Sequence, residues 1–240
     1  MKKFRIFLVC VVVLVLCAGC SSTEVKVAQP TIDHPPYCEA FLKVQGKPLG
    51  EVLPALGLKA ESFTHDENKP QYILNEPVEF LGYEFEMQLL TQWYGFGPES
   101  ETVIAACYIL KAETPEAGAE IVADLRDKLL KGYGAAYNGR KYYSAIPDIK
   151  STSPPSPLNK YTKEDLLSEF TEGSGGRVRL EWLLSVDLSH IPQQVQFVES
   201  YPYTCITATL SGEYPVTDTP ENGQTPYVLI QLNYALSHSY

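Results

Sequence analysis

The run from Val78 to Trp93 constrains the fold most, because its apolar side chains recur at every second position. That period places successive side chains on opposite faces of a β-strand. One face carries Glu84, Glu86 and Gln88. The other face is apolar and comprises Leu81, Tyr83, Phe85, Met87 and Leu89. The run therefore predicts a strand in a sheet that has one buried face and one polar face.

Several later segments also read as strands. Thr102 to Leu110 is apolar on both faces, which predicts a strand in the middle of a sheet. Segments 177–184, 203–210 and 227–236 alternate again, and a short extended piece is expected near Val195 to Val198. The loop from Ser211 to Pro226 joins two of these strands, which indicates an antiparallel meander.

The three later strands repeat the division into an apolar and a polar face. Their apolar positions include Trp182, Leu210 and Tyr234. Their polar positions are Arg177, Arg179, Glu181, Thr207, Thr209, Gln231 and Asn233. Within each strand, the alternation places these polar side chains on the face opposite the apolar one.

Three segments have the pattern of helices. The longest begins with Thr114 as N-cap and Pro115 in its first turn, and Gly132 is expected to end it. Its apolar stripe comprises Ala117, Ile121, Val122, Leu125 and Leu129. A short helix is expected between Pro48 and Gly57, kinked or shortened by Pro54. Another runs from about Lys163 to Phe170, with Thr162 and Asp165 forming a capping box.

This order of elements predicts one α+β domain over residues 37–240. We expect a twisted, mostly antiparallel sheet of five to six strands, with one long helix and one or two short ones on one face. A Pro- and Ser-rich loop is expected at 151–159. The helix-then-meander order is similar, at the level of fold alone, to small envelope lipoproteins that assist outer-membrane assembly and to secreted β-lactamase-inhibitor proteins. That likeness transfers no site to this chain.

The first nineteen residues have the layout of a secretory signal peptide. A basic start of Lys2, Lys3 and Arg5 precedes an unbroken apolar run from Ile6 to Leu16. The run is too short for the roughly 20 apolar residues that span a bilayer, so a permanent transmembrane helix is the weaker interpretation. The segment therefore predicts export.

The end of this segment resembles the lipobox of bacterial lipoproteins. It reads Leu16-Cys17-Ala18-Gly19-Cys20, and Cys17 departs from the aliphatic residue that the family prefers there. The resemblance implies that residues 1–19 are removed and that Cys20 is acylated, which anchors the protein to the cell membrane, or to the outer membrane in a host with two membranes. An ordinary cleaved signal peptide is the alternative. Residues 20–36 are expected to form a tether, with a reach of roughly 20–25 Å as flexible coil.

The charge of the mature chain limits its partners. Removal of Lys2, Lys3 and Arg5 changes the formal net charge from −10 to −13. Such an acidic chain does not favour nucleic acid, because phosphate binding requires a basic surface. Anionic headgroups would repel it as well, so attachment to the membrane is expected through the lipid on Cys20.

Cysteine and histidine indicate no metal site. The mature chain keeps Cys38, Cys107 and Cys205 besides Cys20, without a Cys-x-x-Cys spacing. Cys107 and Cys205 fall in strand-like runs, where one disulfide and two buried thiols are both consistent with the sequence. The four histidines have no metal-binding spacing. We therefore assign no metal, no cofactor and no catalytic residue.

Two sets of residues are candidates for function. Glu84 and Glu86 share a strand face with Cα atoms roughly 6.5–7 Å apart, a spacing compatible with glycosidic chemistry, although solvated surface carboxylates are the favoured interpretation. Trp93, Tyr94 and Phe96 lie on a Gly- and Pro-rich turn and form the candidate contact surface. Aromatic residues on loops also fold back onto the core, which is the structural alternative.

The sequence favours a membrane-anchored extracytoplasmic lipoprotein that is not an enzyme and contacts an envelope protein or a glycan. The first alternative is an extracytoplasmic hydrolase of cell-wall glycan, which requires a pocket at Glu84 and Glu86 with a raised carboxyl pKa. The second alternative is the solute-binding component of an importer, which usually requires two lobes.

Overall fold

The computed structural model describes residues 26–65, 69–91, 102–137, 155–172, 176–185, 187–192, 197–198, 201–216 and 226–238. Over these residues the chain forms an α+β domain with one antiparallel sheet, as the sequence predicts. Its helices, as far as the chain is described, are too short or too polar to cross a membrane.

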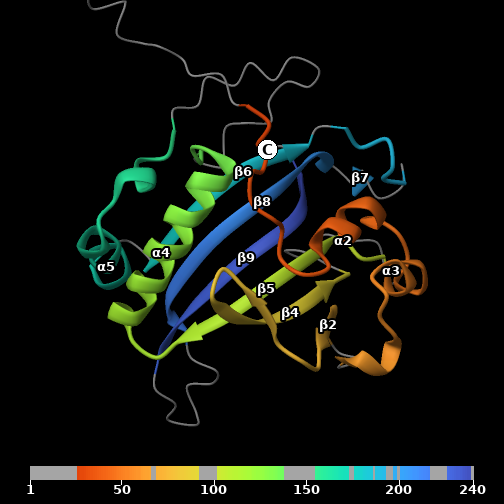
Figure 1. Ribbon diagram of the computed structural model, residues 1–240, viewed down its shortest axis with the longest axis horizontal. Helices are drawn as coiled ribbons and strands as arrows, with labels where there is room; N and C mark the ends of the chain where they lie inside the picture. Colours follow the sequence, from red (N-terminus) through yellow and green to blue (C-terminus); the bar gives the residue numbers. More distant parts are fainter. Residues whose placement is uncertain are drawn as a thin grey trace, which may run out of the picture.

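The sheet has nine strands in the described residues, three more than the largest number expected. Seven strands follow one another across it in the order β1-β2-β4-β5-β9-β8-β6, while β3 pairs with β4 and β7 pairs with β8 (Figure 1). Their bounds are β1 Phe63–His65, β2 Gln71–Leu74, β3 Val78–Phe80, β4 Tyr83–Leu90, β5 Ala105–Ala112, β6 Arg177–Ser185, β7 Phe197–Val198, β8 Tyr201–Val216 and β9 Tyr227–His238.

The structure divides the alternating run at 78–93 into two strands. Leu81 and Gly82 both have positive φ, 53° and 84°, and Phe80 pairs with Tyr83 across them. Two central residues with positive φ make the tight hairpin turn that matches strand twist. The apolar positions change phase at this turn, because Val78 and Phe80 are buried before it and Phe85, Met87 and Leu89 after it. The predicted apolar face therefore began wrongly at Leu81, which lies in the turn and not in a strand. β8 likewise continues to Val216, so the expected loop at Ser211 begins later than predicted.

Four α-helices are described: α2 Cys38–Val44, α3 Leu49–Ala55, α4 Pro115–Tyr133 and α5 Lys163–Thr171. The Thr114 hydroxyl accepts a hydrogen bond from the backbone N–H of Ala117, and Thr162 and Asp165 form the predicted capping box. The expected stop at Gly132 is wrong, because α4 continues to Tyr133 and Gly134, with φ of 82°, follows it.

Gly132 has a packing role instead. A Cβ atom on Gly132 would lie 2.3 Å from the Ile32 side chain, so only glycine lets residue 32 pack there. α2 was not predicted. The predicted stripe on α4 is confirmed at Val122, Leu125 and Leu129, which are fully buried, whereas Ala117 and Ile121 are half-buried.

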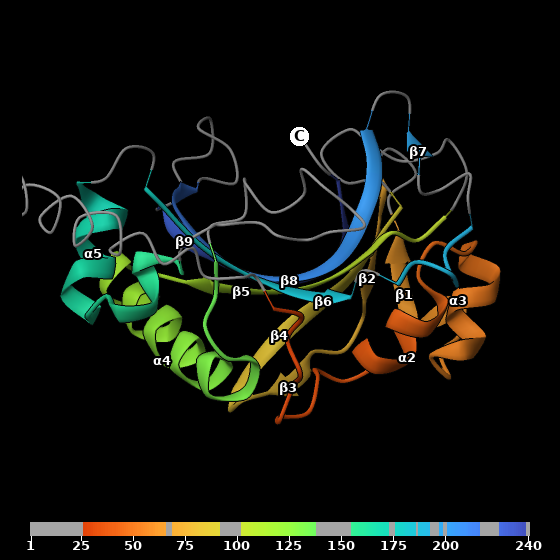
Figure 2. The same ribbon diagram turned by 90° about the horizontal axis from the view of Figure 1, so that it is seen from above.

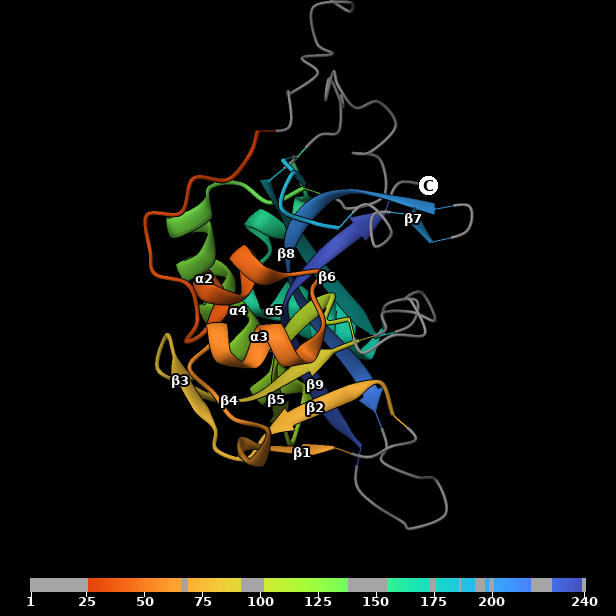
Figure 3. The same ribbon diagram turned by 90° about the vertical axis from the view of Figure 1, so that its right-hand side faces the viewer.

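Helices α2, α4 and α5 lie on the same side of the strongly curved sheet, on its convex face (Figures 2 and 3). Val228, Ile230, Leu232 and Tyr234 of β9 face these helices and are fully buried. We call this face of the sheet the helix face. The odd-numbered residues, including Gln231 and Asn233, are on the concave face, which we call the open face.

The chain from Ala28 to Pro36 lies on the domain. The Ala28 N–H donates to the Leu183 carbonyl of edge strand β6 (2.6 Å), and the Thr31 N–H donates to the Gly132 carbonyl (2.9 Å). The Tyr108 hydroxyl donates to the Pro36 carbonyl at 2.8 Å. This part of the predicted tether is therefore held against the domain.

Cys38, Cys107 and Cys205 are buried free thiols. Cys107 pairs in register with Asn233, and Cys205 pairs with Ser237, four residues further along β9. The sequence was consistent with either a Cys107–Cys205 disulfide or two buried thiols, and the structure has the two thiols.

We predict that Gly118→Ala destabilises the protein by about 1–3 kcal/mol, as overpacking does. A Cβ atom on Gly118 would lie 2.6 Å from Val228, so α4 must move away from β9. Gly50→Ala in α3 is the matched control, because nothing lies within 4 Å of its Cβ position. Alanine there should be neutral or stabilising by about 0.5 kcal/mol. Urea unfolding of both variants measures the difference, and equal stability of the two would contradict the close packing of α4.

Candidate functional site

The sequence-based candidates fall in different places. Cys20, Trp93, Tyr94 and Phe96 lie outside the described residues. Glu84 and Glu86 are exposed on the open face of β4, and the Gln88 amide donates to the Glu86 carboxylate at 2.6 Å. They line a shallow hollow of about 590 Å³ together with Tyr83 and Lys111. These two carboxylates are thus solvated surface groups, as the favoured interpretation expects.

A row of polar side chains crosses the open face at its centre. Glu181 pairs with Thr209, Thr209 with Asn233, Asn233 with Cys107, and Cys107 with Gln88. Paired residues of neighbouring strands project to the same side of a sheet. These five side chains, which we call the polar row, therefore form a continuous line over β6, β8, β9, β5 and β4.

The polar row is buried, although the helices pack on the other face. Glu181 is 2% exposed, Asn233 3%, Thr209 6% and Gln88 9%. The neighbouring Thr207 and Ser211 on β8 are buried as well. Burial raises the pKa of the Cys107 thiol far above its ordinary value, so this residue contributes a neutral thiol. A buried row of this polarity requires hydrogen-bond partners.

Two polar atoms on this face have no partner. Among the described residues, three buried side-chain atoms make no hydrogen bond: Gln45 Oε1, Arg179 Nε and Asn233 Oδ1. The Gln45 amide still donates to the Ile104 carbonyl at 2.7 Å, which fixes that side chain structurally. Asn233 belongs to the polar row, and Arg179 lies beside it on the same face of β6. An unsatisfied buried polar atom costs about 1–3 kcal/mol, so two of them on one face need an explanation.

Arg179 and Glu181 form an ion pair at the β6 end of the polar row. Arg179 Nη2 lies 3.3 Å from Glu181 Oε2, and the Glu181 side chain is 2% exposed. A buried carboxylate is tolerated when a cation and hydrogen bonds compensate its charge. The guanidinium of Arg179, whose side chain is 40% exposed, thus compensates the charge of the Glu181 carboxylate.

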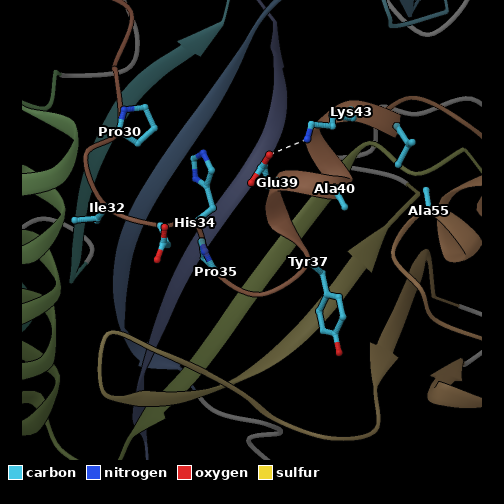
Figure 4. A pocket seen from close by; sticks show the side chains of 11 residues that line it. Pro30, Ile32, His34, Pro35, Tyr37, Glu39, Ala40, Lys43 and Ala55 are labelled. Carbon is cyan, nitrogen blue, oxygen red and sulfur yellow. Dashed lines mark hydrogen bonds and ion pairs between the residues drawn. The ribbon is translucent and has the colours of Figure 1, made fainter.

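A second hollow lies on the helix face, between the Ala28–Pro36 segment and α2 (Figure 4). It has a volume of about 760 Å³, and its lining includes His34, Tyr37, Glu39 and Lys43. The Lys43 ammonium donates to Glu39 at 2.7 Å across its rim. Both members of this pair are mostly exposed, so the pair belongs to the surface of α2.

His34 connects this hollow to a buried aromatic cluster. Its Nδ1 lies 2.8 Å from the Tyr133 hydroxyl, which lies 2.8 Å from the Tyr234 hydroxyl. The rings of His34 and Tyr108 both meet Tyr234 edge-on, with centroids 5.6 and 6.0 Å away. Burial lowers the pKa of His34 from 6.5, against smaller opposing effects of Glu39 and Asp33. These contacts hold the N-terminal segment on the sheet.

The described residues contain no group of three or more His, Cys, Asp and Glu that would hold a metal ion. Comparison of the chain with models of protein families, with curated proteins and with solved structures finds no match. The site must therefore be interpreted from its own geometry.

Sequence reasoning placed most of the row on the correct face but did not identify it as a site. Alternation put Glu181, Thr209, Asn233 and Gln88 on the polar side of their strands. It could not show that they line up across five strands, because the register between strands depends on tertiary structure. It also could not show their burial, since polar positions of an antiparallel strand usually face water.

We predict that His34 makes stability depend on pH. Its folded-state pKa is below 6.5, so the unfolded chain takes up the proton more readily. The free energy of unfolding therefore falls as the pH drops below about 6.5 through the folded-state pKa. Urea midpoints measured from about pH 7.5 to about pH 5 should show a smaller loss in His34→Gln than in the wild type.

His65→Gln is the control, because His65 is exposed in β1. It should keep the pH dependence of the wild type. If His34→Gln also kept that dependence, the contact of His34 with Tyr133 would not contribute to it.

Proposed function

We propose that the protein is a lipid-anchored extracytoplasmic binding protein of the bacterial envelope and not an enzyme. Export and anchoring rest on the layout of Met1 to Cys20, with its lipobox-like ending. The acidic mature chain supports attachment through lipid and gives no basic surface for nucleic acid. The partner is an envelope protein or a glycan.

The observation that carries the binding role is the unpaired Asn233 Oδ1 in the buried polar row. In the described residues, helices α2, α4 and α5 form the core with the other face of the sheet, so the polar row is not part of that core. Groups that the protein itself leaves unsatisfied are suited to a bound molecule, which supplies the missing hydrogen bonds. Trp93, Tyr94 and Phe96 stay a sequence-based prediction of a further contact surface.

The fixed N-terminal segment brings the binding face close to the membrane. If Cys20 carries the lipid, eight Cα steps separate it from Ala28, which is bound to β6. Even fully extended, this length spans about 29 Å. The edge of the domain at β6, which carries Glu181, would therefore lie within about 29 Å of the lipid on Cys20.

Neither alternative gains support from the described residues. The hydrolase hypothesis requires Glu84 and Glu86 in a pocket that shifts a carboxyl pKa, and both side chains are exposed. The importer hypothesis requires a second lobe, and the strands of the described chain belong to one sheet. The binding role needs neither feature.

We predict that Cys20→Ser transfers nearly all of the protein from the membrane fraction to the soluble extracytoplasmic fraction. A serine cannot accept the thioether-linked lipid, and the remaining sequence offers only charge repulsion from anionic headgroups. Cys17→Ser is the matched control and should stay anchored. Fractionation and mass spectrometry of the mature N-terminus measure the result. An anchored Cys20→Ser protein, or an unmodified Cys20 in the wild type, would refute lipidation.

We also predict that a partner contacts the open face. A photo-crosslinking residue in place of exposed Glu86, beside the polar row, should form an adduct in intact envelopes. The same residue in place of exposed Glu164 on α5 should not. The adduct should be lost when Asn233→Leu is added. Adducts from Glu164 alone, or equal adducts from both positions, would place the contact elsewhere.

A further inference from the structure

We infer that the segment from Ala28 to Pro36, which we call the strap, is a proton-controlled spacer. It lies on the domain while His34 is neutral and leaves the domain when His34 is protonated. Its release lengthens the connection between the lipid on Cys20 and the folded core. That effect on reach rests on the lipid anchor of the proposed function, whereas the release itself rests on contacts of the described residues alone.

The strap is a surface layer that the core does not need. Pro35 is its one buried residue, and five of its nine residues are exposed. Hydrogen bonds fix it at three places: at the edge of β6 through Ala28, at the end of α4 through Thr31, and at the aromatic cluster through His34 and Pro36. The buried residues of the main core cluster begin only at Cys38, so they all stay in place when the strap leaves. A segment with so little buried surface opens at a low free energy compared with the whole domain.

Tyr37 is the hinge between the strap and α2. Its φ is 68°, in the left-handed region that a bulky side chain rarely adopts. Contacts on the strap side hold this conformation. The Tyr108 hydroxyl donates to the Pro36 carbonyl at 2.8 Å, and the Cys38 N–H donates to the Pro35 carbonyl at 3.0 Å. Release of the strap frees Tyr37 from its strained backbone conformation, so this strain favours release.

The hydrogen bonds under the strap depend on the protonation of His34. The Tyr234 hydroxyl is fully buried, and its hydrogen-bond partner in the described part of the chain is the Tyr133 hydroxyl. When Nδ1 of His34 is unprotonated, Tyr234 donates to Tyr133 and Tyr133 donates to Nδ1, so both hydroxyl protons are used. A protonated Nδ1 can only donate, which reverses both bonds and leaves the buried Tyr234 proton without this acceptor. The unpaired donor and the buried imidazolium both destabilise the strapped state.

The charged groups around His34 do not cancel this effect. Glu39 of α2 and Asp33 of the strap favour the protonated ring, but burial has the larger effect and keeps the pKa of His34 below 6.5. The other titratable side chains that contact the ring or share its hollow are Tyr133 of α4, Tyr234 of β9, Tyr37 before α2 and Lys43 within it (Figure 4). Burial raises the pKa of Tyr133 and of Tyr234, so both are neutral, and Lys43 pairs with Glu39. Protonation therefore favours the released strap, in which His34 is solvated.

The release has a defined pH range and a defined effect on reach. His34 has a pKa near 6.5 in the released strap and a lower pKa in the bound strap. Between these two values, each unit of falling pH raises the ratio of released to bound strap by up to about tenfold. The bound strap leaves eight Cα steps between Cys20 and Ala28, or about 29 Å when extended. The released strap leaves seventeen steps between Cys20 and Tyr37, or about 61 Å, so the maximum reach doubles.

The test measures the position of the strap in the full mature chain, purified in mild detergent. Nitroxide labels are attached through Gln29→Cys in the strap and Lys131→Cys in α4, both at exposed positions. The native thiols of Cys38, Cys107 and Cys205 are buried and stay unlabelled. Electron paramagnetic resonance should show one narrow distance at about pH 7.5, and a second, broader distribution whose share rises as the pH falls from about 6.5 to about 5. The same distribution at both ends of this range would overturn the inference.

Two variants and a second pair of labels separate release of the strap from unfolding. In His34→Gln the released share should be the same at every pH, because the titrating group is gone. His65→Gln is the matched control and should respond as the wild type does, because His65 is exposed in β1. Labels at Lys131 and at exposed Glu164 of α5 should keep one distance over the whole range, because α4 and α5 both pack on the core. Release that still depends on pH in His34→Gln, or a distance between the two helices that changes with pH, would overturn the inference.

The outcome is distinct from that of the test for lipidation. A strap that stays bound at about pH 5 in a chain with lipid on Cys20 would refute the switch and leave the anchor in place. Release on acidification in a chain with an unmodified Cys20 would establish the switch and refute only the anchor and the change in reach.

Discussion

The pairing of β9 with β5 on one side and β8 on the other is the constraint on which the structure depends. β9 pairs with β5 without a break from Val228 to Ala235, and with β8 without a break from Leu229 to Ser237. Because side chains alternate along a strand, this one register decides which residues enter the core and which reach the open face. A shift by one residue would exchange Tyr234 and Asn233. The aromatic cluster and the polar row are thus two results of the same pairing.

The helix face is held by close contacts that allow little change of register. Gly118 of α4 lies over Val228, and Gly212 of β8 lies against Phe170 of α5. On the same side, the indole of Trp182 donates to the Gly134 carbonyl at 2.9 Å and fixes the end of α4. Buried Arg126 donates to the carbonyls of Leu158 and Tyr161 and joins α4 to the start of α5. Burial on this face supplies the main core and holds the sheet in position for the open face.

Local patterns predicted most elements and failed where tertiary contacts decide. Thr114, Thr162 and Asp165 correctly predicted the starts of α4 and α5, because the capping hydrogen bonds of these residues are local. The helix end predicted at Gly132 was wrong, because this glycine is required for close packing against the distant Ile32 and not for ending the helix. Asp124 and Lys128, four residues apart in α4, form a salt bridge at 2.6 Å, whereas Asp127 contacts the neighbouring Arg126. The order of the strands in the sheet has no local signal in the sequence. The alignment of the polar row from Glu181 to Gln88 therefore could not be predicted.

The polar row is where the sequence departs from what stability alone would select. Valine or leucine at Thr209 or Asn233 would satisfy the strand pattern and leave no buried atom unpaired. Departures of this kind concentrate at functional positions, since elsewhere they only cost stability. Gln45 is an example of a structural residue. Its oxygen is unpaired, but its amide nitrogen donates a hydrogen bond to the Ile104 carbonyl, which fixes the side chain. Asn233 and Arg179 instead leave an acceptor and a donor on one face, and Arg179 also pairs with Glu181. That combination is the reason for proposing that the polar row has more than a structural role.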